Sequence, residues 1–198
     1  MKAGNGILLG IVFAASCTSS VGPIIESYFP SENQSRVYES EKRERVTVET
    51  KFEMTVINSL EMHSWTTRFP SETGEESYLS LLKVDQSIRL VAIGVGHGAM
   101  APNGDLTFLP AKLQEGVPWS ARFRVQEGGK YEISLEGGPV SEKVVTREKT
   151  YLARRIEINL HAESGSIPLI KLWYEKDHGF VRFDNGRGHW DLVEEKHQ

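Results

Sequence analysis

From Arg45 onward the chain alternates apolar and polar residues with a period of two, which is typical of a half-buried β-strand. The apolar positions of the first such run are Val46, Val48, Phe52, Met54 and Val56. A second clear run places Leu152, Ile156, Ile158 and Leu160 on one face. Because successive side chains of a strand point to opposite faces, both runs predict strands that bury a single face.

Shorter runs of the same kind fill the rest of the chain. Further strands are expected at 62–69, 77–84, 87–93, 106–109, 118–126, 130–136, 140–147, 151–162, 168–175, 180–184 and 189–193. Gly-rich and Asn-Gly segments separate them, at 103–104, 127–129, 137–139 and 184–186, and these favour hairpin turns. The pattern predicts an all-β antiparallel meander, forming a curved sheet or half-open barrel, with at most one short helix near 21–29.

The N-terminal segment has a different pattern. Lys2 precedes an apolar run from Ile7 to Ala15, and the small residues before Cys17 follow it directly. A membrane-spanning helix needs about 20 apolar residues, so this run has the length of an export signal instead. Ala14-Ala15-Ser16-Cys17 resembles the bacterial lipobox, although a bulky residue usually stands where Ala14 does. The resemblance implies that residues 1–16 are a lipoprotein signal peptide and that Cys17 is lipidated.

Cysteine usage agrees with this interpretation. Cys17 is the single cysteine of the 198 residues, so the remaining chain has no disulfide and no cysteine nucleophile. Residues 17–45, rich in Ser, Pro and Glu, predict a lipidated cysteine and a flexible tether, and 46–195 a β-rich periplasmic domain. In enteric bacteria an Asp after the cysteine favours inner-membrane retention, so Thr18 favours the inner leaflet of the outer membrane.

The C-terminal half carries a recognisable order of motifs. Leu109-Pro110 is followed by Gly116-Val117-Pro118-Trp119, then by paired strands, and then by Trp173-Tyr174 with Gly179-Phe180-Val181. This order resembles the tail of an uncharacterised family of bacterial periplasmic proteins and lipoproteins, a domain of unknown function. The resemblance covers residues 107–193 and implies a curved antiparallel sheet without an established catalytic residue.

Four residues are candidates for contact with a ligand. Trp173 and Tyr174 are neighbours in a strand, so one is expected in the core and the other at a rim or in a concave lumen. Gly96 and His97 lie in a Gly-rich segment that lacks the spacing of a dinucleotide-binding loop, yet such loops allow close approach of ligands. Trp65, Trp119 and Trp190 are expected to anchor the core.

Metal and catalytic signatures are weak. His178 and His189 would face each other if their strands paired, and with Asp177 or Asp191 they are the candidates for a metal site, but no metal is predicted. There is no Gly-x-Ser-x-Gly motif. Four carboxylates could supply an acid–base pair for sugar hydrolysis, namely Glu157, Glu163, Glu175 and Asp177, but the sequence does not place any two of them at the separation that this chemistry needs. No cofactor is expected, and the net charge of −4 disfavours nucleic acid as a partner.

The sequence therefore predicts a lipid-anchored, non-enzymatic envelope lipoprotein that faces the periplasm and binds a protein, glycan or other ligand there. Two alternatives remain open at this point. One is a carrier of lipids or lipoproteins with an apolar cavity, and the other is a hydrolase of envelope glycans.

Overall fold

The computed structural model of the protein describes residues 29–69, 77–95, 98–101, 106–111, 116–124, 131–186 and 188–197. Thirteen strands and no helix occur in this part of the chain, so it holds no helix of the length and apolarity of a membrane span. The strands are β1 Gln34–Ser40, β2 Arg45–Ile57, β3 Leu60–Phe69, β4 Ser77–Val84, β5 Ser87–Val95, β6 Gly98–Met100, β7 Thr107–Leu109, β8 Trp119–Arg124, β9 Glu132–Val145, β10 Thr150–Ala162, β11 Gly165–Glu175, β12 Gly179–Asp184 and β13 His189–His197.

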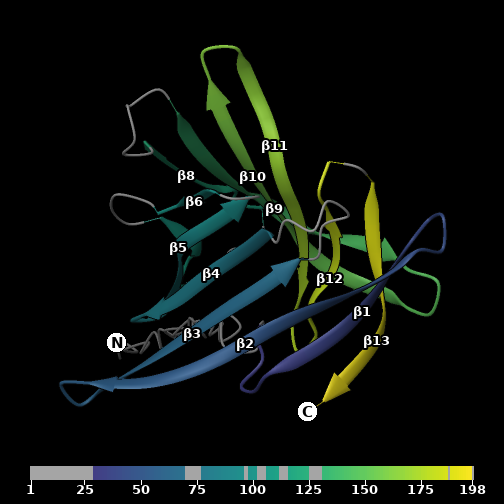
Figure 1. Ribbon diagram of the computed structural model, residues 1–198, viewed down its shortest axis with the longest axis horizontal. Helices are drawn as coiled ribbons and strands as arrows, with labels where there is room; N and C mark the ends of the chain where they lie inside the picture. The colour runs from purple at the N-terminus through teal and green to yellow at the C-terminus, as the bar shows by residue number, and fades with distance from the viewer. Residues whose placement is uncertain are drawn as a thin grey trace, which may run out of the picture.

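All of these strands belong to one antiparallel sheet, which confirms the predicted fold class (Figure 1). The order is β6-β5-β4-β3-β2-β1-β13-β12-β11-β10-β9-β8, and β7 pairs with β5 outside this path. The first and last strands of the described chain are therefore neighbours in the middle of the sheet. The sheet curls without closing into a barrel, and a hydrogen bond from Trp119 Nε1 to the Phe108 carbonyl (3.1 Å) joins β8 to β7 near its two ends.

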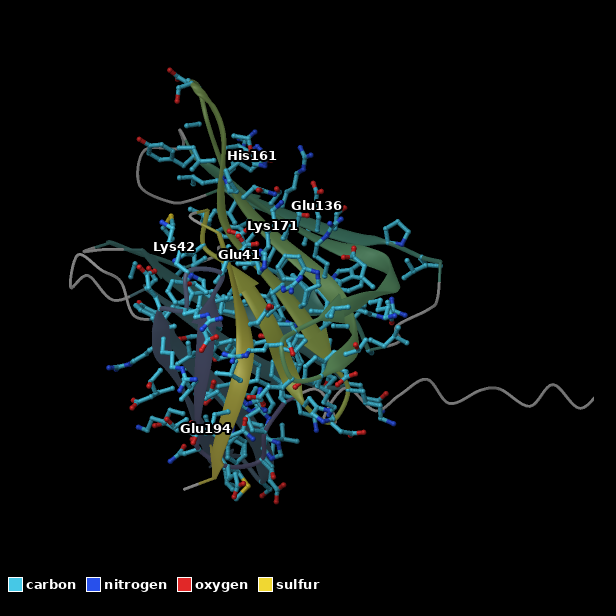
Figure 2. All side chains as sticks on the ribbon, turned by 90° about the vertical axis from the view of Figure 1, so that its right-hand side faces the viewer. Glu41, Lys42, Glu136, His161, Lys171 and Glu194 are labelled. Carbon is cyan, nitrogen blue, oxygen red and sulfur yellow. The ribbon has the colours of Figure 1, made fainter. Side chains whose placement is uncertain are left out.

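Aromatic side chains fill the concave side of the sheet. Tyr38 lies at its centre, stacked on Phe180 with ring centroids 5.2 Å apart, and its hydroxyl donates to the Phe180 carbonyl at 2.8 Å. Phe183 packs against the same tyrosine from β12. Rings from β3, β7, β11 and β13 complete the cluster, namely Trp65, Phe69, Phe108, Tyr174 and Trp190. The convex side carries charged residues instead, such as Glu136, Lys171 and Glu194 (Figure 2).

Most of the expected strands are present, but the tether prediction was partly wrong. β1 lies within 17–45 and pairs with both β2 and β13. Its sequence, QSRVYES, has polar residues at both ends, so the pattern did not predict a strand, although the centre of β1 is buried. Arg36 is only 5 % exposed and points toward the aromatic interior, where its Nη1 lies 3.5 Å from the Phe180 carbonyl oxygen. The domain therefore begins before Val46.

The turn expected at 137–139 was also wrong, because β9 runs continuously through these residues. Gly137 lies under the indole of Trp119, and a Cβ built at this position would be 2.1 Å from the ring. The register with β10 is irregular between Arg154 and Ile156, opposite this segment. The glycines therefore make room for a ring and a bend within one strand, and the true turn follows at Thr146–Lys149, where the Thr146 amide donates to the Lys149 carbonyl.

We expect Gly137→Ala to lower the free energy of unfolding by about 1–3 kcal/mol, because the new methyl group overlaps the Trp119 ring and forces it to move. Gly138→Ala is the matched control, since a Cβ there meets its nearest neighbour at 3.4 Å. Urea unfolding followed by tryptophan fluorescence measures both variants. Equal stability of the two variants would contradict the proposed role of Gly137.

Candidate functional site

The structure separates Trp173 from Tyr174 as strand alternation predicts. Tyr174 is 3 % exposed and packs against Phe29, Phe108 and Phe180, so it is a core residue and does not face an open ligand site. Burial raises the pKa of its hydroxyl far above the ordinary value. Trp173 points to the convex side and is half-buried there. Gly96, His97 and Cys17 lie outside the described residues.

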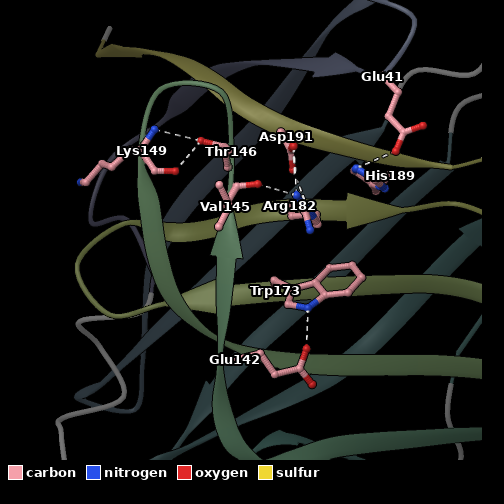
Figure 3. Close-up of polar contacts among 9 residues, drawn as sticks. All are labelled: Glu41, Glu142, Val145, Thr146, Lys149, Trp173, Arg182, His189 and Asp191. Atoms are coloured by element: carbon pink, nitrogen blue, oxygen red, sulfur yellow. Dashed lines mark hydrogen bonds and ion pairs between the residues drawn. The ribbon is translucent and has the colours of Figure 1, made fainter.

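The side chain of Trp173 belongs to a polar network on the convex surface (Figure 3). Its Nε1 donates to Glu142 Oε2 at 3.1 Å, and the guanidinium carbon of Arg182 lies 5.9 Å from the ring centroid. Arg182 binds both carboxylate oxygens of Asp191, with Nη2 donating to Oδ2 at 3.0 Å. The network thus joins the three consecutive strands β11, β12 and β13 to β9, which precedes them in the chain and is separated from β11 by β10 in the sheet.

The same arginine also holds the β9–β10 hairpin in place. The end of this hairpin bends across the convex faces of β11, β12 and β13 (Figure 3), and Arg182 Nη2 donates to the Val145 carbonyl at 3.0 Å. Farther along the hairpin, Arg147 Nη1 donates to Glu39 Oε1 on β1 at 3.1 Å. Arg45, then Arg147, hold the pKa of the Glu39 carboxyl below its ordinary value, so this carboxylate is charged at neutral pH.

A third set of contacts joins the hairpin to the β11–β12 turn. Glu175 Oε1 accepts from the Leu152 amide at 2.9 Å, and Glu175 Oε2 lies 2.9 Å from His178 Nδ1. Lys149 Nζ lies 2.7 Å from His178 Nε2 and 4.9 Å from the centroid of the Tyr151 ring. Because an ammonium group only donates, Nε2 accepts and the imidazole proton sits on Nδ1, which lies 3.3 Å from the Lys176 carbonyl oxygen. The contact between Lys149 and His178 links the β9–β10 turn to the β11–β12 turn, which is a structural role.

Three long-range anchors therefore fix the outer face of the β9–β10 hairpin. Two large apolar side chains are exposed on this face, Val145 at 59 % and Leu152 at 63 %. Val145 pairs with Thr150 and Leu152 pairs with Lys143, so the two side chains are diagonal neighbours on the same face. We call Lys143, Val145, Thr150 and Leu152 the hairpin surface. Sequence reasoning missed it because its anchors are 23 to 108 residues away along the chain.

The predicted juxtaposition of His178 and His189 was wrong. Their strands do pair, but the register places His189 opposite Asp184, at the far end of β12 from His178. About six residues separate the two positions, or about 20 Å along a strand. His189 Nε2 lies 3.4 Å from Glu41, exposed on the surface (Figure 3). Within the described residues there is no group of three or more His, Cys, Asp or Glu side chains suited to a metal ion.

The carboxylates considered for acid–base chemistry are separated too. Glu157 lies 3.1 Å from Arg155 and 3.8 Å from Lys171, on the convex face. Glu175 is four residues from Lys171 along β11, about 13 Å away, and is engaged with His178. Glu163 and Asp177 lie beyond opposite ends of the same strand. The described residues thus do not bring these carboxylates together in a cleft.

Comparison with known proteins identifies no relative of this chain. No family model matches the chain, and no curated protein or solved structure matches it significantly. The class that the structure defines is therefore an all-β protein with a single curled antiparallel sheet, and the resemblance of its tail to a lipoprotein family stays an expectation.

Proposed function

We propose that the protein is a lipid-anchored, non-enzymatic component of the bacterial cell envelope. Cys17 carries the lipid, the β domain faces the periplasm, and the inner leaflet of the outer membrane is the site of attachment. The domain binds a periplasmic protein through the hairpin surface. The lipobox-like segment and the single cysteine support the anchor, and two exposed apolar side chains on a firmly anchored hairpin support the binding surface.

The hairpin surface suits a protein partner for a physical reason. Exposed apolar side chains gain free energy when a partner covers them, and a surface that is already rigid loses little entropy on binding. Arg182, Arg147 and Glu175 supply that rigidity through contacts to Val145, Glu39 and the Leu152 amide. Lys143 and Thr150 add polar groups beside the apolar pair.

The two alternatives have less support. A carrier needs an apolar cavity, whereas the concave side of the described sheet is packed with aromatic rings from Tyr38 to Trp190. A glycan hydrolase needs two carboxylates near each other, and the candidate carboxylates lie apart on the convex side and in turns. Native mass spectrometry tests the carrier directly, because a lipid that remains bound in addition to the covalent anchor would favour it.

The anchor is tested by Cys17→Ala. We expect the variant to lose labelling by radioactive palmitate and to leave the outer-membrane fraction, since the thiol is the only one available in the chain for lipid attachment. A variant that still incorporates palmitate would overturn the anchor.

The binding surface is tested by photo-crosslinking in cells. A photoreactive phenylalanine in place of Leu152 is expected to give a discrete protein adduct, whereas the same group at the exposed Glu136, elsewhere on β9, is not. Identical adducts from both positions, or none from Leu152, would refute the hairpin surface.

A further inference from the structure

The β2–β3 hairpin extends beyond the rest of the sheet as a ribbon of two strands. β1 pairs with β2 only as far as Thr50, and β4 pairs with β3 only from Ser64. Between these points each strand pairs only with the other, as far as the described chain shows. Figure 1 shows this end of the hairpin projecting past the neighbouring strands at the lower left. No third strand of the described chain covers this part of the hairpin, and isolated two-stranded ribbons are marginally stable in water.

The end of the ribbon is apolar and exposed. We define the ribbon tip as Met54, Val56, Ile57 and Leu60, which are 57 %, 61 %, 50 % and 70 % exposed. Asn58 and Ser59 form the turn between them with positive φ values of 51° and 66°, and both are uncharged. Elsewhere in the described chain no other hairpin end gathers four such side chains. Contiguous exposed apolar groups of this kind mark a contact with a partner or a membrane.

Charged residues surround the tip on the side of the sheet. Lys51 and Glu53 form an ion pair, and Glu61 lies 3.9 Å from His63. Glu61 directly follows Leu60 and pairs with Val56, so only Ile57, Leu60 and the turn between them lie beyond the last charge, roughly 5–7 Å along the ribbon. This is the depth at which amphipathic segments rest in the headgroup region of a bilayer.

The start of the described chain lies at the base of this ribbon. Phe29 packs against Trp65 with ring centroids 5.0 Å apart, and Trp65 Nε1 donates to the Pro30 carbonyl. Trp65 pairs with Phe52, five residues from the turn, so the tip lies about 17 Å farther along the ribbon. Cys17 precedes Phe29 by twelve residues, which span at most about 40 Å even when fully extended.

From this placement we infer that the ribbon tip inserts into the lipid bilayer as a second membrane contact beside the lipid anchor. The inference takes its orientation from the proposed anchor at Cys17, which keeps the bilayer within reach of the tip. An anchored chain presents the tip to the membrane at a high effective concentration, so even a weak insertion is populated. The domain would then be held at two points, with the ribbon lying between the sheet and the membrane.

The test uses the full mature protein in vesicles of phosphatidylethanolamine and phosphatidylglycerol. Leu60→Cys is labelled with an environment-sensitive fluorophore, and quenching by lipids that carry a quencher in their acyl chains is measured. Ile167→Cys is the matched control, because Ile167 is an apolar residue 52 % exposed near the β10–β11 turn. We expect a blue shift and strong quenching at position 60 and neither at 167. Equal quenching at both positions, or none at 60, would overturn the inference.

A second pair of variants measures the contribution of the tip without a label. The double substitution Ile57→Asp and Leu60→Asp is expected to weaken vesicle binding at least about tenfold. Burial of a single leucine side chain in an apolar environment already changes a partition coefficient by about that factor. Ile167→Asp is expected to change it little. These side chains are exposed, so circular dichroism should show an unchanged fold. If the tip instead crosslinks to a protein and stays unquenched by lipid, it is a protein-binding site and the lipid contact is refuted.

The number of fluorophores attached to each protein molecule tests the proposed anchor at Cys17 separately from the ribbon tip. A lipidated Cys17 has no free thiol, so intact mass should show one label on Leu60→Cys. Two labels would mean that Cys17 is free and that the anchor fails. In that case the same quenching comparison, made in a Cys17→Ala background, decides the tip alone, because Leu60→Cys and Ile167→Cys then differ only in the position of the label.

Discussion

Replacing Phe183 with alanine is expected to lower the free energy of unfolding by about 3–5 kcal/mol. Phe183 is 1 % exposed and sits among rings from three other strands. Its ring centroid lies 5.2 Å from Tyr38, 5.2 Å from Phe69 and 6.0 Å from Trp190. Removing the ring leaves a cavity that these neighbours cannot all collapse to fill, because each is fixed by its own strand.

Urea unfolding followed by tryptophan fluorescence measures this loss, and Trp190, stacked on Phe183, reports it directly. Tyr131→Ala is the control, because Tyr131 is 45 % exposed and its removal should change the stability by less than about 1 kcal/mol. A Phe183→Ala variant as stable as Tyr131→Ala would mean that the concave side is not the tightly packed core described above.

The fold class could be predicted because one face of most strands is apolar. β4 begins and ends where the alternation predicts, at Ser77 and Val84, and β12 differs from its expected range by one residue. β1 escaped notice because only Val37 and Tyr38 are apolar in it, while Ser35 and Arg36 are buried with them. A strand that two neighbours flank in the middle of a sheet can bury polar side chains that an isolated pattern would assign to solvent.

The turn wrongly predicted at 137–139 has a different cause, which is the need for glycine beside an aromatic ring. A Gly-Gly-Pro sequence is typical of a turn, yet Gly137 and Gly138 lie inside β9, where the Trp119 ring occupies the space beside Gly137. The need for glycine here is set by a ring on another strand, and local sequence does not carry that information. The hairpin surface could not be predicted for the same reason, because Arg182 contacts the Val145 carbonyl only where β9 bends across β12.

Arg182→Ala is expected to lower the free energy of unfolding by about 2–3 kcal/mol and to loosen the hairpin surface. The substitution leaves the Asp191 carboxylate, which is 18 % exposed, without its bidentate partner, and removes the donor to the Val145 carbonyl. Breaking a partly buried, hydrogen-bonded ion pair from one side leaves a charge with incomplete solvation, which is why the loss exceeds that of a surface pair. Arg182→Lys should fall between, because an ammonium group does not reproduce the two-point contact.

Arg122→Ala is the control for this prediction, since Arg122 is 65 % exposed and lies 3.6 Å from Glu132 in a surface ion pair worth about 0–1 kcal/mol. A double-mutant cycle with Asp191→Ala isolates the coupling between the two partners. Hydrogen exchange at the hairpin amides should accelerate in Arg182→Ala and not in Arg122→Ala, and the adduct formed from position 152 should weaken in parallel. If stability falls while both hairpin readouts stay unchanged, Arg182 supports the sheet alone, and the rigidity of the hairpin surface must come from Arg147 and Glu175.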